Sequence, residues 1–197
     1  MSGATKKSDG IGGMIKLGLI LAAYAVAACT VLAIVNNVTS PVIAENNIKK
    51  ANEAMKTVFP GADTFEPVDF TGTTKSGSTS IDSVCIAKKD GNTLGAVAQI
   101  SGPTYEQSTI MVGMDSDGIV TGMRFLENSD TPGFGQNATK PAFYEQFAGK
   151  DSSKGFVTGK TFDAISGATI TSNGIATMMD DVCSAMVDCL SQSRSGK

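Results

Sequence analysis

The stretch "IDSVCIAKKDGNTLGAVAQIS", residues 81–101, contains two runs of strand-forming residues separated by Asp90-Gly91. An Asp-Gly pair between two such runs is a strong signal for a β-hairpin with a tight turn. A third run, STIMVGMDS, begins at Ser108, and a second turn at Asp117-Gly118 leads into a fourth, IVTGMRFLE. Four successive strands joined by short turns predict an antiparallel meander over residues 81–127.

Helical periodicity lies on both sides of these strands. Before them, Ser40-Pro41 has the form of an N-cap followed by a proline in the first turn, and the apolar spacing that follows predicts a helix ending at Phe59. After them we expect a short helix near 141–147 and a last amphipathic helix, whose apolar residues are Ile175, Met178, Val182, Met186 and Leu190. The predicted fold class is therefore α+β, an antiparallel sheet with flanking helices.

A membrane span is predicted ahead of this domain. Residues 17–35 read LGLILAAYAVAACTVLAIV, a run without charge that is long enough to cross a bilayer as a helix. Lys6, Lys7 and Lys16 precede it and favour a cytoplasmic N-terminus. An alternative is a lipoprotein signal cleaved before Cys29, because "VAAC" at 26–29 resembles a lipobox. The apolar run continues beyond Cys29, which favours an uncleaved anchor.

Composition excludes several classes of function. The chain has no histidine, which removes the usual general base and the commonest metal ligand, so we expect neither a hydrolytic triad nor a metal site. Its four cysteines show no CxxC spacing. The net charge is −3 and the two arginines lie far apart, so nucleic acid is not an expected partner.

The stretch "DAISGATITSNG", residues 163–174, joins a small-residue loop rich in hydroxyl groups to the last predicted helix. The N-terminal amides of a helix are unpaired and carry a positive partial charge, which suits a phosphate. The simplest alternative is an ordinary Ser/Thr-rich helix cap. A threonine hydroxyl here could hydrogen-bond a phosphate or be esterified by one.

The longer pattern in this stretch is similar to the flavinylation motif of the FMN-binding domain family. The resemblance implies that a flavin transferase, drawing on FAD, attaches FMN through a phosphoester to Thr169. It also implies that neighbouring residues shape the attachment loop and that Asp163 helps the transferase to engage it. The loop residues are Ser166, Gly167, Ala168 and Thr171.

A second stretch, "ENSDTPGFG" at residues 127–135, resembles the ETPGLG loop of the same family, with Asp130 in place of the glutamate and Phe134 in place of the leucine. By that resemblance the loop forms part of the isoalloxazine pocket, and its candidate residues are Thr131, Pro132, Gly133, Phe134 and Gly135. The chain departs from the family at 101–109, where SGPTYEQST replaces a GYGG-like stretch. Contacts in that segment cannot be transferred.

One anchor, a length near 200 residues and a single SGATxT resemble the G subunits of Rnf, the ion-translocating ferredoxin:NAD oxidoreductase. The C subunits of the sodium-pumping NADH:quinone reductase are the alternative, being similar in layout but generally longer. The resemblance implies a redox subunit of a translocase, with no catalytic residues of its own, whose covalent FMN relays electrons. Its expected partners are the other Rnf subunits, the flavin transferase and the membrane.

The predicted organisation is a cytoplasmic tail at 1–13, a transmembrane helix at 14–36, a connecting helix and loop at 37–79, an extracytoplasmic FMN-binding domain at 80–192 and a tail at 193–197. The expected location is the bacterial inner membrane. Two alternatives remain: a flavinylated lipoprotein outside any Rnf complex, and an anchored module that binds a phosphate-bearing ligand without a covalent bond.

Overall fold

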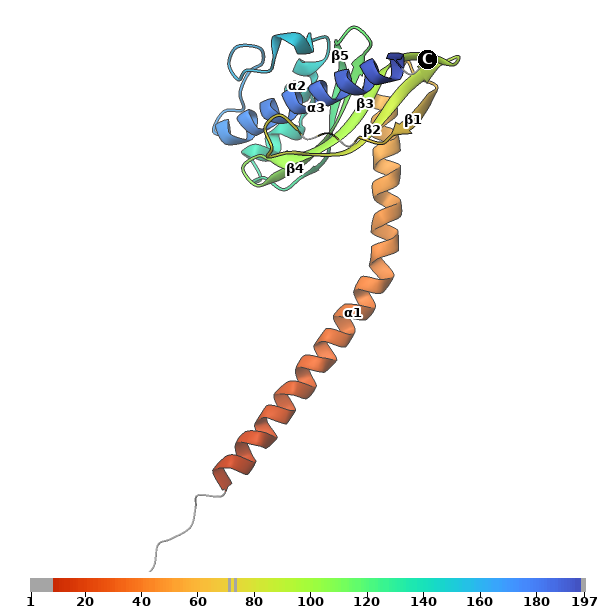
Figure 1. Ribbon diagram of the computed structural model, residues 1–197. Coiled ribbons are helices and arrows are strands. Elements are labelled where there is room, and N and C mark those ends of the chain that lie inside the picture. The colour runs from red at the N-terminus through yellow and green to blue at the C-terminus, as the bar shows by residue number, and fades with distance from the viewer. Residues whose placement is uncertain (1–8, 71, 73, 196–197) are drawn as a thin grey trace, which may run out of the picture. The chain divides into compact units, whose positions relative to one another are not determined.

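The computed structural model describes residues 9–70, 72 and 74–195. The chain divides into two compact units between Ile48 and Lys49. The described part of the first is helical. The second contains a five-stranded sheet with helices on its faces, which confirms the predicted α+β class (Figure 1).

The N-terminal helix α1 runs without interruption from Asp9 to Val58. Among the described residues, α1 is the one helix whose length and apolar composition would allow it to cross a membrane. Its end agrees with the sequence prediction, but the separate helix start expected at Ser40-Pro41 is wrong, because Pro41 lies inside α1. Proline has a helical φ and removes one backbone hydrogen bond, so a Ser-Pro pair permits either a start or a continuation.

The sheet is an antiparallel meander in the order β1-β2-β3-β4-β5. Its strands are β1 (Thr64–Val68), β2 (Ser80–Lys89), β3 (Asn92–Pro103), β4 (Gln107–Asp115) and β5 (Val120–Asn128). Both predicted turns are present: Asp90 and Gly91 have φ of 49° and 78°, and Gly118 has φ of 84°. Two consecutive residues with positive φ suit a two-residue hairpin, so β2 and β3 are held in register by their turn.

Strand β1 lies in the segment 37–79, for which helix and loop alone were expected. It pairs with β2 along its whole length, from Thr64 opposite Lys88 to Val68 opposite Val84. Most of its residues are exposed and it contains Pro67. Proline is tolerated on an edge strand, where its missing N–H faces away from the neighbouring strand. The sheet therefore extends to residues N-terminal to the predicted meander.

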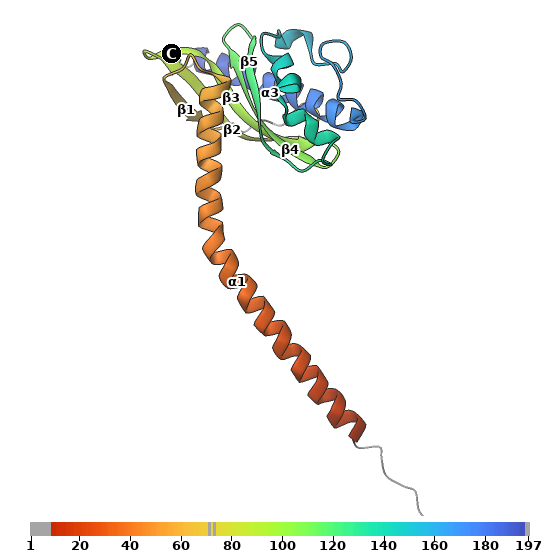
Figure 2. The same ribbon diagram turned by 180° about the vertical axis from the view of Figure 1, so that it is seen from behind.

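The last helix, α3 (Thr169–Ser195), packs against one face of the sheet (Figures 1 and 2). Alternate residues of β3 face it, and the intervening ones face the end of α1, where Ala54 and Val58 pack with Val97. Near its start α3 comes very close to β3: a Cβ on Gly174 would lie 2.4 Å from the carbonyl oxygen of Pro103. This close approach places the first turns of α3 beside the end of β3.

The connection between β5 and α3 carries short helical turns: α2 (Pro141–Tyr144) and three 3-10 turns, η1 (Gly135–Thr139), η2 (Glu145–Phe147) and η3 (Ser152–Lys154). The short helix predicted near 141–147 corresponds to α2 and η2. A cluster of aromatic rings anchors the connection, with Phe147 as its centre, 4.8 Å from the Phe162 ring centroid. Phe147 is fully buried. The loops on either side of this anchor belong to the two motif stretches, residues 127–135 and 163–174.

Candidate functional site

Helix α3 begins at Thr169, so the stretch DAISGATITSNG is half loop and half helix. Gly167 has φ of 75°, a left-handed conformation that favours glycine, and it turns the chain into the helix. A Cβ at Gly167 would meet the ring of Phe134 at 3.2 Å. The turn therefore brings the two sequence motifs into contact.

The hydroxyl groups of this stretch fall into two classes. Thr171 and Ser172 are buried: Ser172 donates to the carbonyl of Ala168 and accepts from the N–H of Ile165, which closes the loop onto the helix. Ser166 and Thr169 are exposed. Two hydroxyls thus hold the turn together, and two face solvent at the positive end of the helix macrodipole.

A fully buried carboxylate, Asp130, links the two motifs. Its Oδ2 accepts a hydrogen bond of 2.7 Å from the Thr171 hydroxyl. Its Oδ1 accepts one of 2.7 Å from the Thr104 hydroxyl and one of 2.8 Å from the N–H of Glu106. Gly135 lies against the same group, since a Cβ there would be 2.6 Å from Oδ2. Three chain segments therefore meet at one side chain.

A cavity of about 270 Å³ opens beside this network. Three large hydrophobic residues at its wall are more than half exposed: Tyr105 (61%), Ile170 (60%) and Phe134 (55%). Small residues line the rest, so the backbone is accessible there. The complete lining is Tyr105, Thr131, Phe134, Gly135, Gly167, Ala168, Ile170 and Thr171. Apolar side chains left exposed around one pocket are typical of a ligand-binding site.

The structure brings most of the sequence-predicted residues together. Six of them line the pocket: Thr131, Phe134, Gly135, Gly167, Ala168 and Thr171. Thr169 stands between two lining residues, whereas Pro132, Gly133, Ser166 and Asp163 do not line the cavity. Asp163 is exposed, and its N–H donates to the Gln146 side chain.

Sequence reasoning missed two lining residues and one buried network. Tyr105 lies in the stretch where the family pattern fails, and Ile170 is a variable position inside the motif. Asp130 was recognised only as a substitute for a glutamate. The signal that could have found Tyr105 is an aromatic residue in an otherwise polar turn between two strands.

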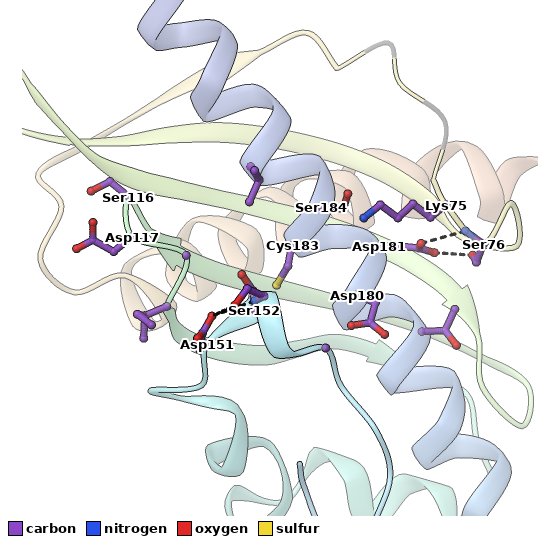
Figure 3. Close-up of a pocket in the computed structure, with 16 residues that line it drawn as sticks. Lys75, Ser76, Ser116, Asp117, Asp151, Ser152, Asp180, Asp181, Cys183 and Ser184 are labelled. Carbon is purple, nitrogen blue, oxygen red and sulfur yellow. Dashed lines mark hydrogen bonds between the residues drawn. The ribbon is translucent and has the colours of Figure 1, made fainter. Parts of the chain in front are cut away.

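A larger cleft, of about 1010 Å³, lies along the middle of α3 (Figure 3). Its lining carries one lysine, Lys75, against four carboxylates: Asp117, Asp151, Asp180 and Asp181. Such a charge balance disfavours an anionic phosphate, so size alone does not make this cleft the FMN site.

Two titratable groups in the cleft have raised pKa values. Burial, together with the nearby charge of Asp180, raises the pKa of the Cys183 thiol to about 12. Partial burial also raises the pKa of Asp180, with the charge of Asp181 adding to the effect and a hydrogen bond from the Phe156 N–H opposing it. The Cys183 thiol is thus neutral at physiological pH, which disfavours a role as a nucleophile.

Two family models match the chain in separate regions. Residues 104–184 match the FMN-binding domain, and residues 11–58 match the RnfG N-terminal region. The first match covers every residue that lines the smaller pocket, and the second covers nearly all of α1. The site and the helix are therefore matched independently.

Curated proteins match the chain to different extents. The chain is 31% identical over 178 residues to the G subunit of the Na⁺-translocating ferredoxin:NAD⁺ oxidoreductase complex of Acetobacterium woodii, covering 81% of this chain and 85% of that protein. It is 35% identical to the C subunit of the Na⁺-translocating NADH-quinone reductase of Pasteurella multocida, but this match covers 43% of this chain and 40% of that one.

A solved structure supports the fold. The crystal structure of NqrC from Shewanella oneidensis has a TM-score of 0.55 and 18% identity, and the match covers 74% of this chain and 99% of that one. At that identity the likeness concerns the fold alone.

Proposed function

We propose that this chain, which belongs to the family of G subunits of ion-translocating ferredoxin:NAD⁺ oxidoreductase complexes, holds FMN covalently on Thr169 and relays electrons within such a complex. The family makes the chain a redox subunit of a translocase with an FMN-binding domain. The covalent bond, the attachment residue and the orientation in the membrane are the finer parts of the proposal.

The exposed hydroxyl at the first residue of α3 supports attachment at Thr169. Attachment from FAD forms a bond between Thr169 Oγ1 and the phosphorus of the FMN half, breaks the pyrophosphate bond and releases AMP and the hydroxyl proton. The product is a phosphate diester with one negative charge. It would sit at the helix N-terminus, where unpaired N–H groups stabilise an anion.

The pocket beside Thr169 fits the flat part of the cofactor. Its volume is close to the lower limit of ligand pockets, about 300 Å³. It is therefore suited to the ring system, and the exposed Thr169 next to it would hold the phosphate end. Phe134, Tyr105 and Ile170 supply apolar surface for the ring, which accounts for their exposure.

Bound FMN would supply the electron-transfer chemistry, and the protein's role is to hold the ring and tune its potential. A site with no catalytic side chain fits that role. A covalent bond also prevents loss of the cofactor outside the cytoplasm, where no FMN pool is expected. Electrons would pass between neighbouring carriers of the complex, and the flavin transferase and the other subunits are the partners.

Helix α1 supplies the membrane anchor and makes the chain a single-pass membrane protein. We place the N-terminus in the cytoplasm because of Lys6, Lys7 and Lys16, and the FMN-binding domain on the outer side of the bacterial inner membrane.

The test is flavin fluorescence of denatured protein after expression with a flavin transferase. Wild type should retain the flavin and Thr169→Val should carry none. Thr177→Val is the matched control: Thr177 lies on α3 and its hydroxyl donates only within the helix, to the Asn173 carbonyl, so this variant should match wild type. Flavin retained by Thr169→Val would refute the attachment site. Flavin released from wild type on denaturation would favour the non-covalent alternative.

A further inference from the structure

Three chain segments line the pocket, and one of them is the loop 131–135 that directly follows Asp130. The other two form walls that are far apart in the sequence. One wall is the first turn of α3 with the loop before it, and the other is the connection between β3 and β4, which carries Tyr105. No regular backbone pairing joins these two walls, because β3 and β4 pair with each other and not with α3. Their separation is set by the close packing of α3 on the end of β3 at Gly174 and by side chains that bridge the two segments.

Asp130 is the side chain that contacts both walls. Through Oδ2 it accepts from Thr171, in the first turn of α3. Through Oδ1 it accepts from the hydroxyl of Thr104 and the N–H of Glu106, the residues on either side of Tyr105. Each carboxylate oxygen thus holds one wall.

Burial makes this arrangement rigid. Asp130 has no exposed surface, and Thr104 and Thr171 are 7% and 1% exposed. Gly135 packs against the same group, because a Cβ there would lie 2.6 Å from both Asp130 Oδ2 and the Thr171 hydroxyl oxygen. A buried polar group that loses its partner keeps the full cost of desolvation, so this network favours a single geometry.

We infer that Asp130 is the positioning residue of the flavin site, and that it fixes the turn that carries Thr169 relative to the turn that carries Tyr105. The cofactor readouts below rest on the proposed function, whereas the structural readout does not. Asp130 acts through Thr104, Glu106 and Thr171, and it also places a negative charge behind the pocket wall.

The molecule offers a matched control in Asp181. Asp181 is 3% exposed and also accepts three hydrogen bonds, from the N–H and hydroxyl of Ser76 and from the hydroxyl of Thr79. It lies on α3 ten residues beyond Thr171, about 15 Å along the helix. Asp130→Asn and Asp181→Asn therefore remove equivalent interactions at different places.

The first readout is hydrogen exchange on the full-length chain in detergent, made without a flavin transferase. Asp130→Asn should speed exchange about tenfold in both residues 103–107 and residues 167–172, the size expected for losing a buried hydrogen bond. Asp181→Asn should speed exchange in the segment 74–80 and leave both walls unchanged. Unchanged exchange in either wall of Asp130→Asn would overturn the inference.

Two single-wall variants keep the test decisive if Asp130→Asn does not fold. Thr171→Val should loosen residues 167–172 alone, and Thr104→Val should loosen residues 103–107 alone, because each removes one donor to Asp130. If both variants leave exchange of both walls at the wild-type level, the hydrogen bonds do not position the site.

The second readout is the midpoint potential of attached flavin. Asp130→Asn should shift it to a more positive value, because a negative charge behind the wall disfavours added electrons. Thr171→Val retains that charge, so it should shift the potential less, and Asp181→Asn should not shift it. A potential in Asp130→Asn equal to that of wild type would refute the electrostatic part. Wild type that carries no flavin would instead refute the proposed function and leave the exchange result standing.

Discussion

Two concave regions along α3 differ in chemistry although a buried, triply hydrogen-bonded aspartate is found at each, behind the wall of the smaller one and in the lining of the larger one. The pocket at the first turn is small, has no charged side chain in its lining and lies at the positive end of the helix, whereas the cleft at the middle is nearly four times larger and lined by carboxylates. Asp130 joins two walls of the pocket, and Asp181 ties a surface loop to the cleft. The charge of the lining, and not the volume, therefore decides which of the two regions is proposed as the cofactor site.

The largest stability effect is expected at the contact that separates the two regions. Gly174→Ala places a Cβ 2.4 Å from the Pro103 carbonyl oxygen, so α3 must move away from the end of β3. The clash should cost about 3 kcal/mol, and better helix propensity should return about 1 kcal/mol, for a net loss of about 2 kcal/mol. Urea unfolding measures it.

The same variant should affect the pocket and leave the cleft unchanged. Because Gly174 lies between the pocket and the cleft, Gly174→Ala should reduce flavin attachment without changing exchange in the segment 74–80. Wild-type stability together with wild-type attachment would mean that the close packing of α3 on β3 does not shape the pocket.

A smaller effect is expected for Asp181→Asn. The variant replaces an oxygen that accepts two hydroxyl groups, from Ser76 and Thr79, by an amide nitrogen. The loss should be about 1–2 kcal/mol of unfolding free energy, and flavin attachment should be unaffected. Reduced attachment in this variant would show that the two regions are coupled through α3.

The smallest effect is expected at Asp180, and it depends on pH. Because the fold raises the pKa of this carboxyl, its charged form opposes folding above that pKa. Asp180→Asn should therefore stabilise the protein at pH 7 by at most about 0.5 kcal/mol, since the side chain is exposed and solvent screens it. The amide oxygen can still accept from the Phe156 N–H.

The sign of this effect can be checked by titration. As the pH falls through the raised pKa, Asp180 itself becomes neutral, so the difference between variant and wild type should shrink towards zero in thermal unfolding. A difference that grows at acidic pH would contradict the assignment of the raised pKa to Asp180.

Local pattern predicted the regular parts of the fold. Strands β2 to β5 follow from alternating apolar residues and from the turns at Asp90-Gly91 and Asp117-Gly118, and α3 follows from its apolar periodicity. Strand β1 was missed because it is short, mostly exposed and contains Pro67, so its pairing with β2 leaves no local pattern. The continuity of α1 was missed because Ser-Pro also occurs at helix starts.

The site was predictable only in part, because sequence patterns reveal contiguous motifs and not contacts between distant residues. The motif loops at 131–135 and 166–171 were found because each is a contiguous pattern. Their link through Asp130 and Thr171 joins residues 41 positions apart, and the link between Asp181 and Ser76 joins residues 105 apart. Such contacts depend on the packing of α3 against the sheet, which residue spacing does not contain.

Peptide mass mapping of the denatured protein from its native membrane is the direct test for covalent FMN on Thr169. The peptide containing Thr169 should gain the mass of FMN less one water, and no other peptide should. An unmodified Thr169 peptide, in a host with an active flavin transferase, would show that Thr169 does not carry FMN and leave the turn as a helix cap or a reversible phosphate site.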